Sequence, residues 1–269
     1  MSHYILENAS EFERLEKQSQ NKFYDYESEL REFHPHPGSL ILDAGCGSGV
    51  VSRYLARKFT SSKVVGCDFS DIRVIQAARH SGPIQNLTFQ REDLTRLSFE
   101  NETFDHVILR YVAQHQSPKD LKQIFSEVFR VLKDGGTVHV VDADGFLYNL
   151  HPVDPMVESV ISKIRDSKRV DFEIGRKLPD LLIKTGFGDL DWKVEVCSFQ
   201  GDDLPDEQQR MIERFQLAHP FFLELLNDRQ SVDRFFESYL KAMLQPGAVM
   251  FFNQFVVSGV KQFNSSKVE

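Results

Sequence analysis

The sequence predicts an α/β protein in which helices cover a mostly parallel sheet. Short apolar runs bounded by turn residues alternate along the chain with segments whose apolar residues recur every three or four positions. A short, continuously apolar run is typical of a strand buried on both faces, and helical crossovers between parallel strands produce this alternation. The composition, with 41% hydrophobic and 27% charged residues among 269, is that of a globular protein.

The N-terminal part is predicted to be one helix over residues 9–33. Ser10 and Glu13 have the spacing of a capping box, and a loose apolar stripe follows them. The prolines within residues 34–39 end this helix, because proline cannot continue the helical hydrogen bonds.

The alternation of strands and helices begins after these prolines. Strands are predicted at 40–43, 63–68, 86–91, 104–110 and 136–142, with helices at 48–59, at 70–80 and before the fifth strand. The helix before the fifth strand has the clearest pattern, with Leu121, Phe125 and Val128 on one face, and Gly135–Gly136 are expected to stop it.

The second half departs from strict alternation. Helices are predicted near 154–168 and around Leu178–Leu182, a sixth strand at 191–199, a helical insertion at 205–245 and a final strand at 249–260, antiparallel beside the sixth. The predicted organisation is an N-terminal helix (1–37), a core (38–145), an insertion (146–174), a core helix with the sixth strand (175–200), a helical cap (201–247) and the last strand (248–262).

Charge and cysteine content exclude some classes of protein. The net charge of −8 disfavours a nucleic-acid partner, because phosphate binding needs clustered Lys and Arg. Three scattered residues, Cys46, Cys67 and Cys197, provide neither a disulfide framework nor a CxxC metal pair. Because no apolar run reaches the length of a membrane span and the N-terminus is polar and acidic, we expect a cytoplasmic protein without a membrane partner.

One loop has the pattern of a ligand-binding turn. Between the first strand and the following helix stands the stretch Asp43-Ala44-Gly45-Cys46-Gly47-Ser48-Gly49. Glycines let the backbone approach a ligand closely, and the start of the helix favours an anionic group. The spacing is GxGxG with Val50 next, so the dinucleotide pattern GxGxxG fails.

Acidic residues follow the next two strands. Asp68 ends the second strand, where a carboxylate can accept both hydroxyls of a ribose, and Phe69 beside it offers a face for a purine. Asp93 follows the third strand and can accept from an adenine amino group, while Leu94 packs on the ring. Each acid alone could be a helix cap or a surface charge. Together with the glycine loop they indicate one nucleoside site at the carboxyl edge of the sheet.

These segments resemble the class I S-adenosylmethionine-dependent methyltransferases. ILDAGCGSG resembles their first motif, VVGCDFS their second strand, and REDLTRLSFENETFDHVILRYVAQH their adenine-contact and fourth-strand segment. VFRVLKDGGTVHVVD resembles their fifth strand with the preceding helix, and GRKLPDLLIKTGF their late helix. The resemblance covers residues 39–142, and ERLEKQ resembles the lid helix of the small-molecule members.

The resemblance implies a Rossmann-like, seven-stranded sheet of order 3-2-1-4-5-7-6, with strand seven antiparallel and helical cap insertions. S-adenosyl-L-methionine would be the cofactor. Its methionine part would meet the glycine loop and the Arg110 backbone, and its ribose would meet Asp68. The N-terminal segment would form a lid that contacts the cofactor through Gln18. The cofactor-binding residues expected from the motifs and the resemblance are Gln18, Asp43, Ala44, Gly45, Gly47, Asp68, Phe69, Asp93, Leu94 and Arg110.

The acceptor side is less defined. His115 follows the fourth strand and is our candidate general base, although it could simply pack in that loop. Tyr111, Gln114, Tyr148 and His151 fall after the fourth and fifth strands and are candidates for binding the acceptor. The many late Phe residues are interpreted either as plain core or as a hydrophobic lid over an apolar acceptor.

The function expected from these features is methyl transfer to O or N of a small-molecule acceptor by in-line displacement, without a metal. The alternatives are a protein methyltransferase and a non-catalytic cofactor-binding regulatory protein. The sequence does not determine the acceptor. It also leaves the oligomeric state open, and a dimer is one alternative.

Overall fold

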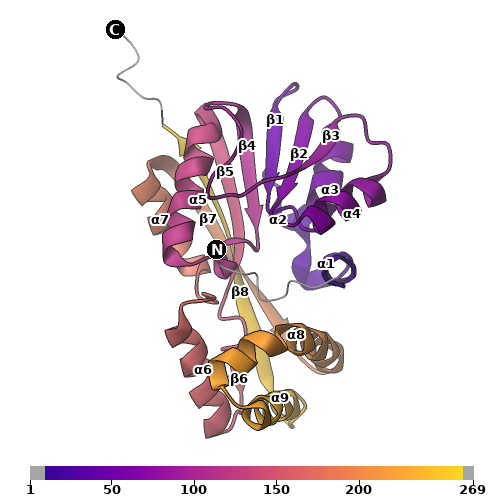
Figure 1. Ribbon diagram of the computed structural model, residues 1–269, viewed down its shortest axis with the longest axis vertical. Coiled ribbons are helices and arrows are strands. Elements are labelled where there is room, and N and C mark those ends of the chain that lie inside the picture. Colours follow the sequence, from indigo (N-terminus) through magenta and orange to yellow (C-terminus); the bar gives the residue numbers. More distant parts are fainter. Residues whose placement is uncertain (1–9, 263–269) are drawn as a thin grey trace.

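A computed structural model describes residues 10–262, and a single sheet organises them (Figure 1). Within these residues the sheet has eight strands: β1 (Leu40–Ala44), β2 (Lys63–Asp68), β3 (Leu87–Arg91), β4 (Phe104–Arg110), β5 (Leu132–Asp144), β6 (Leu150–His151), β7 (Phe187–Phe199) and β8 (Val249–Lys261). The first five strands pair in parallel, in the order β3-β2-β1-β4-β5. The α/β class and the mostly parallel sheet predicted from the alternation are confirmed.

The last strand, β8, joins two parts of the sheet. It pairs antiparallel with β5 on one side and with β7 on the other, so the predicted sixth and seventh strands are β7 and β8 in the predicted order. The sequence did not predict β6, which pairs with the first residues of β8. Two residues are too few to show a period, so a strand of this length has no signal in the sequence.

Helices cover both faces of the sheet. They are α1 (Glu11–Ser19), α2 (Tyr26–Glu29), α3 (Val50–Lys58), α4 (Asp71–Ser81), α5 (Pro118–Val131), α6 (Pro155–Ser167), α7 (Leu178–Thr185), α8 (Asp203–Leu226) and α9 (Arg229–Met243). Leu42 and Val107 pack in one apolar cluster with α5 and α7, whereas Ile41 and Ile108 pack in another with α3. Because neighbouring residues of a strand point to opposite faces, these two clusters lie on opposite sides of the sheet.

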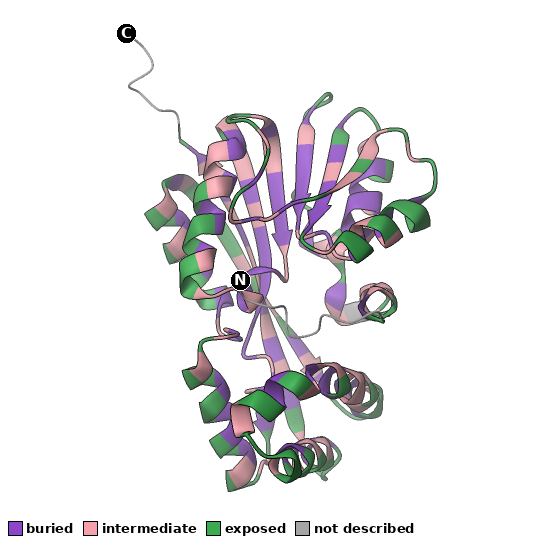
Figure 2. Cartoon of the chain, in the orientation of Figure 1, coloured by how far each residue is buried: buried purple, intermediate pink, exposed green. Residues whose placement is uncertain are grey.

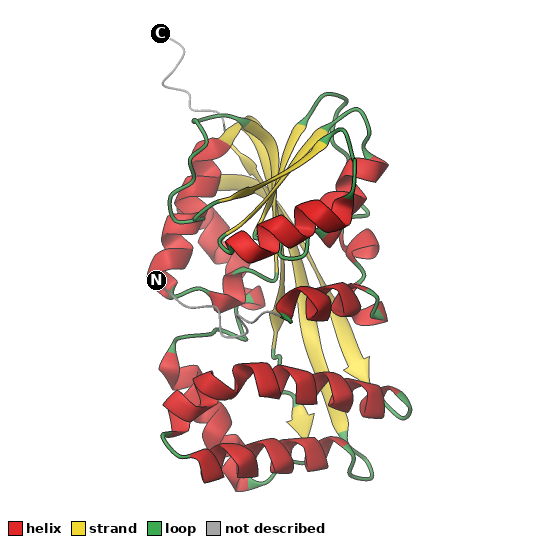
Figure 3. Cartoon of the chain, turned by 45° about the vertical axis from the view of Figure 1, so that its right-hand side comes forward, coloured by secondary structure: helices red, strands yellow, loops and turns green. Residues whose placement is uncertain are grey.

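The helices α6, α8 and α9 form a separate group, which we call the cap. They gather around the extended end of β8, away from α3, α4 and α5 (Figures 1 and 3). Aromatic side chains hold this group together, and the rings of Phe215 and Phe236 stack at 4.4 Å. Figure 2 shows buried residues on the inward sides of the cap helices and exposed residues on their outer sides. Within residues 10–262 no helix combines the length and the apolar character that a membrane span needs.

The single helix predicted over 9–33 is wrong. The segment forms three short pieces, α1, the 3-10 helix η1 (Lys22–Tyr24) and α2. The Asn21 side chain accepts from the Phe23 N–H, and the Asp25 side chain accepts from the N–H groups of Glu27 and Ser28, so each residue starts a new turn. Side chains of this kind compete with the continuing helix for backbone donors. The capping hydrogen bond expected of Ser10 is not formed either.

The predicted stop at Gly135–Gly136 of the helix before the fifth strand is also wrong. The helix α5 ends at Val131, and Leu132 is already extended and paired with Phe104. Leu132 is fully buried there, so entry into the sheet ends the helix before the glycines are reached. The glycines instead lie within β5.

Candidate functional site

The glycine loop after β1 is a tight backbone turn. Gly45 has a φ of +81°, and a Cβ atom there would lie 2.5 Å from Cγ2 of Val112. The N–H groups of Gly45 and Cys46 both donate to the Cys67 carbonyl oxygen at 2.8 Å, which ties the loop to the end of β2. A side chain in place of Gly45 would be strained in its backbone and would displace Val112, so glycine is required at this position.

Asp43 lies beneath this loop. It is 2% exposed, and burial raises the pKa of its carboxyl to about 6. The Ser52 hydroxyl on α3 donates to it at 2.5 Å, which holds the loop against the helix. Ala44, the other residue expected here, is buried in β1 and is not among the residues that line the cavity described below.

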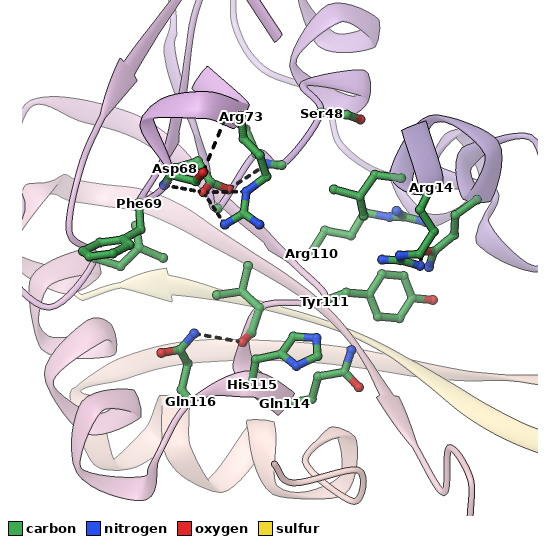
Figure 4. A pocket seen from close by; sticks show the side chains of 18 of the residues that line it. Arg14, Ser48, Asp68, Phe69, Arg73, Arg110, Tyr111, Gln114, His115 and Gln116 are labelled. Atoms are coloured by element: carbon green, nitrogen blue, oxygen red, sulfur yellow. Dashed lines mark hydrogen bonds and ion pairs between the residues drawn. The ribbon is translucent and has the colours of Figure 1, made fainter. Parts of the chain in front are cut away.

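Asp68 at the end of β2 is nearly buried and points at the loop (Figure 4). Its Oδ2 accepts from the Gly47 N–H at 3.0 Å. Its Oδ1 accepts from the Ser70 N–H at 3.0 Å and pairs with the Arg73 guanidinium, with Nη2 at 2.9 Å. A ribose hydroxyl can therefore reach a lone pair of Oδ2, whereas binding of both hydroxyls requires Arg73 to release Oδ1.

The residues expected around an adenine lie close to Asp68. Phe69 is half exposed, and the Arg91 guanidinium lies 5.1 Å from its ring centre. Leu94 is buried, and Oδ1 of Asp93 accepts from the N–H and hydroxyl of Thr95 at 2.9 and 2.7 Å. Within residues 10–262 no hydrogen bond to Oδ2 of Asp93 is found, so this oxygen can accept from an amino group.

The turn after β4 has a buried carboxylate under it. In the 3-10 helix η2 (Ala113–His115), the Gln114 N–H donates to Oδ2 of Asp142 at 3.2 Å, and the Ala143 N–H donates to Oδ1 at 2.8 Å. Asp142 is fully buried, and burial raises the pKa of its carboxyl to about 7. Burial, together with the positive charges of two nearby arginines, lowers the pKa of His115 to about 3, so its imidazole is neutral at physiological pH.

One cavity of about 860 Å³ joins these groups. Figure 4 shows Asp68 and Phe69 on one side of it and Tyr111, Gln114 and Arg14 on the other. Of the residues predicted to bind the cofactor or the acceptor, those lining the cavity are Gln18, Asp43, Gly45, Gly47, Asp68, Phe69, Asp93, Leu94, Arg110, Tyr111, Gln114 and His115.

Two candidate acceptor-binding residues lie outside this lining. Tyr148 packs on Phe172, and the Arg165 guanidinium lies 4.2 Å from the centre of the Tyr148 ring. His151 is exposed in β6. The prediction assumed that residues after β5 face the cavity, but the turn after this strand directs Phe146 and Leu147 into the cavity instead.

Side chains of the cap helix α8 and of the segments on either side of α6 complete the lining, which the sequence analysis raised only as one of two interpretations of the late Phe residues. These residues are Phe146, Leu147, Phe172, Met211, Arg214, Phe215, Ala218, Phe221 and Phe222. Those on α8 recur at steps of three and four, so the sequence did carry a signal for one apolar face on this helix. That signal does not say whether the face meets a ligand or other side chains. Phe215 and Phe222 do both, because they also belong to the cap core.

Two arginines line the cavity where the cap meets the N-terminal helices. Arg214 on α8 pairs with the fully buried Glu207 at 2.6 Å and donates to the Tyr24 hydroxyl at 3.3 Å. Arg14 on α1 pairs with the buried Glu11 at 2.7 Å. Each guanidinium is thus matched by a carboxylate. Within the described residues no group of three His, Cys, Asp or Glu side chains is placed to hold a metal ion.

The fold and this cavity define a Rossmann-like protein whose cavity lies at the carboxyl ends of its parallel strands and continues to the apolar side chains of the cap. Comparisons with known proteins agree on the class. Residues 41–136 match the family model described as a methyltransferase domain.

The curated relatives match only part of this chain. The sterol 24-C-methyltransferase of Saccharomyces cerevisiae is 36% identical over 108 residues, which are 39% of this chain and 27% of that enzyme. The sterol 24-C-methyltransferase of Schizosaccharomyces pombe is 29% identical over 177 residues, 63% of this chain and 43% of that enzyme. The chain therefore spans about a quarter to two fifths of the length of these relatives.

Solved structures share the fold over most of the chain. Phosphoethanolamine N-methyltransferase 2 of Haemonchus contortus, in complex with phosphomonomethylethanolamine and S-adenosylhomocysteine, has a TM-score of 0.61 at 19% identity and covers 95% of this chain and 58% of its own. The YcgJ protein of Bacillus subtilis has a TM-score of 0.58 at 20% identity and covers 87% and 97%. Residues 41–136 thus resemble a methyltransferase domain, and the chain has the fold of the class I S-adenosylmethionine-dependent methyltransferases.

Proposed function

We propose that this chain transfers the methyl group of S-adenosylmethionine to an oxygen or nitrogen atom of a small molecule whose apolar body lies under the cap. The observation that carries the proposal is the continuous cavity of about 860 Å³, with the glycine loop and Asp68 at one end and cap side chains at the other. This volume is in the upper part of the ~300–1,000 Å³ range of ligand sites, which leaves room for a second molecule beside the cofactor.

S-adenosylmethionine is the cofactor, and it supplies a methyl group on a positively charged sulfur. The residues present fit its parts. Gly45 and Gly47 line the cavity without a side chain, so their backbone can approach the methionine part, and a Cβ at either position would overlap Val112 or Leu15. Oδ2 of Asp68 can accept from the ribose, and Asp93 with Leu94 can hold the adenine.

The protein's own contribution is alignment and exclusion of water. The helices α1 and α8 both line the cavity, through Leu15 and Gln18 on one and Met211 and Phe215 on the other. The neutral imidazole of His115 can accept a proton, although its low pKa makes it a weak base. The base role of His115 and the lid role of the N-terminal helices stay predictions.

The Phe-lined end of the cavity supports a small apolar acceptor over a peptide. The names of the relatives do not decide the methylated atom, since the sterol enzymes are named for a carbon and the phosphoethanolamine enzyme for a nitrogen. The match to the family model, residues 41–136, also ends before the cap begins. The cytoplasmic location and the lack of a nucleic-acid partner stay predictions.

The test is release of S-adenosylhomocysteine from S-adenosylmethionine in the presence of apolar small molecules that carry hydroxyl or amino groups. We expect acceptor-dependent release that Asp68→Ala abolishes. Asp180→Asn, which changes an exposed acid on α7, should leave it intact. Release with peptides alone would favour a protein methyltransferase. Cofactor binding without release for any acceptor would favour a regulatory protein.

A further inference from the structure

A buried chain of hydrogen bonds connects the N-terminal helices to the end of β4. Arg110 forms a bidentate pair with Glu29 of α2: Nε donates to Oε2 at 2.5 Å and Nη2 donates to Oε1 at 2.7 Å. Glu29 is 4% exposed, so this pair is shielded from water. A carboxylate that accepts from two donors of an arginine offers only acceptors to its other neighbours.

The next member of the chain is Gln254 on β8, which is 3% exposed. Its Nε2 donates to Oε1 of Glu29 at 2.9 Å. Flipping the amide would bring its oxygen against a carboxylate oxygen, and two acceptors in a buried site repel each other. The Glu29 carboxylate therefore fixes which end of the amide is the nitrogen.

The same nitrogen donates to the Tyr111 hydroxyl oxygen at 2.5 Å. Since Gln254 provides the proton of that hydrogen bond, the proton of the Tyr111 hydroxyl must go elsewhere. Within residues 10–262 no hydrogen bond donated by the Tyr111 hydroxyl is found. Burial raises the pKa of the Tyr111 hydroxyl well above its usual value, so the hydroxyl keeps its proton at neutral pH.

Tyr111 lies where the two ends of the cavity meet. It lines the cavity directly after β4, and its backbone is held in the left-handed region with a φ of +55°. Its ring contacts the ring of Tyr24 at 5.2 Å, and the Tyr24 hydroxyl accepts from Arg214 of the cap. Strained backbone at a cavity wall persists only where the surroundings fix it, and here both the ring and the hydroxyl are held.

We propose that the Tyr111 hydroxyl donates a hydrogen bond to an oxygen of the methyl acceptor, so that the cavity selects small apolar molecules that present an oxygen lone pair at the junction of its two ends. The relay of Arg110, Glu29 and Gln254 sets the direction of this hydrogen bond. A group that offers only donors, such as an ammonium, cannot accept this hydrogen bond and gains nothing from the Tyr111 proton. The inference rests on the proposed function and names the chemistry of its acceptor.

Two matched probes test the direction of the hydrogen bond at Tyr111. 2-Acetylnaphthalene and 2-isopropenylnaphthalene have nearly the same shape, but only the first has an oxygen that can accept. Both are titrated calorimetrically into the protein saturated with S-adenosylhomocysteine, whose own binding is measured first. The wild type should bind the ketone about 2- to 10-fold more tightly, the range expected for one net hydrogen bond.

The variants assign the preference to residues. Tyr111→Phe keeps the ring and should abolish the preference while leaving the affinity for the alkene unchanged. Gln254→Leu should reduce the preference, since the Tyr111 hydroxyl is then no longer held as an acceptor. Tyr148→Phe, outside the cavity lining, is the control and should retain it.

Failure of this inference differs from failure of the proposed function. Equal affinity for the two probes in the wild type, binding of neither, or a ketone preference that survives Tyr111→Phe would overturn the role of Tyr111 even if S-adenosylhomocysteine binds normally. A protein that does not bind S-adenosylhomocysteine would instead contradict the proposed function.

Discussion

The two ends of the cavity are built by different kinds of sequence. At the cofactor end, each position depends on one special property: the positive φ of Gly45, the carboxylate of Asp68 or the Asx turn of Asp93. At the cap end, residues such as Phe215 and Phe222 contribute apolar area and also form the cap's own core. The lining of the cofactor end is visible as a motif, whereas the lining of the cap end has the same pattern as any other apolar helix face.

The difference between the two ends is tested most strongly by truncating two buried Phe residues of the cap. Phe222 lines the cavity, whereas Phe235 is fully buried and does not. Phe222→Ala and Phe235→Ala should each lower the free energy of unfolding by about 3–5 kcal/mol, measured by urea denaturation. Only Phe222→Ala should also weaken binding of 2-acetylnaphthalene. Equal losses of binding in the two variants would mean that lining the cavity and forming the cap core are not separable roles.

Matched glycine substitutions test the cofactor end. Gly45 and Gly201 both have positive φ, but a Cβ at Gly201 meets no atom within 4 Å, whereas one at Gly45 meets Val112. Both alanine variants should lose about 1–2 kcal/mol of stability from backbone strain, and Gly45→Ala should lose more because its Cβ displaces Val112. Gly45→Ala should in addition weaken S-adenosylhomocysteine binding in calorimetry. Unchanged affinity in Gly45→Ala would contradict the assignment of the loop.

An effect that depends on pH is expected from the carboxylate under η2. Because burial raises the pKa of Asp142 to about 7 in the folded protein, folding is favoured by its proton. That contribution is complete below the unfolded pKa of about 4 and is lost as the pH rises through about 7. The stability of the wild type relative to Asp142→Asn should therefore fall by about 1.4 kcal/mol per pH unit across this window. Urea denaturation of both proteins at pH 5 and pH 7 measures it, and a difference independent of pH would show that Asp142 is ionised throughout.

Much of the fold could be predicted because its signals are local. Apolar runs such as that of β4 and the helical period of α5 need no knowledge of the rest of the chain. The errors arise where distant contacts decide. The helix α5 ends at Val131 because Leu132 pairs with Phe104, and the N-terminal segment breaks where Asn21 and Asp25 cap new turns.

The same distinction applies to the site. The glycine loop and the acids after β2 and β3 could be found because each follows a strand whose end reaches the same edge. Tyr148 was placed by the same rule, but the turn after β5 directs it toward Arg165. The relay behind Tyr111 joins Glu29, Arg110 and Gln254 from three distant parts of the chain, so no spacing in the sequence indicates it.

The most direct test of the two-ended cavity is calorimetric titration of the wild-type protein with S-adenosylhomocysteine, alone and after saturation with 2-acetylnaphthalene. If the cavity has a cofactor end and an acceptor end, S-adenosylhomocysteine should bind one to one in both titrations, because the two ligands occupy different ends. Absence of binding, or competition in which the probe displaces S-adenosylhomocysteine, would contradict a cavity with two separate ends.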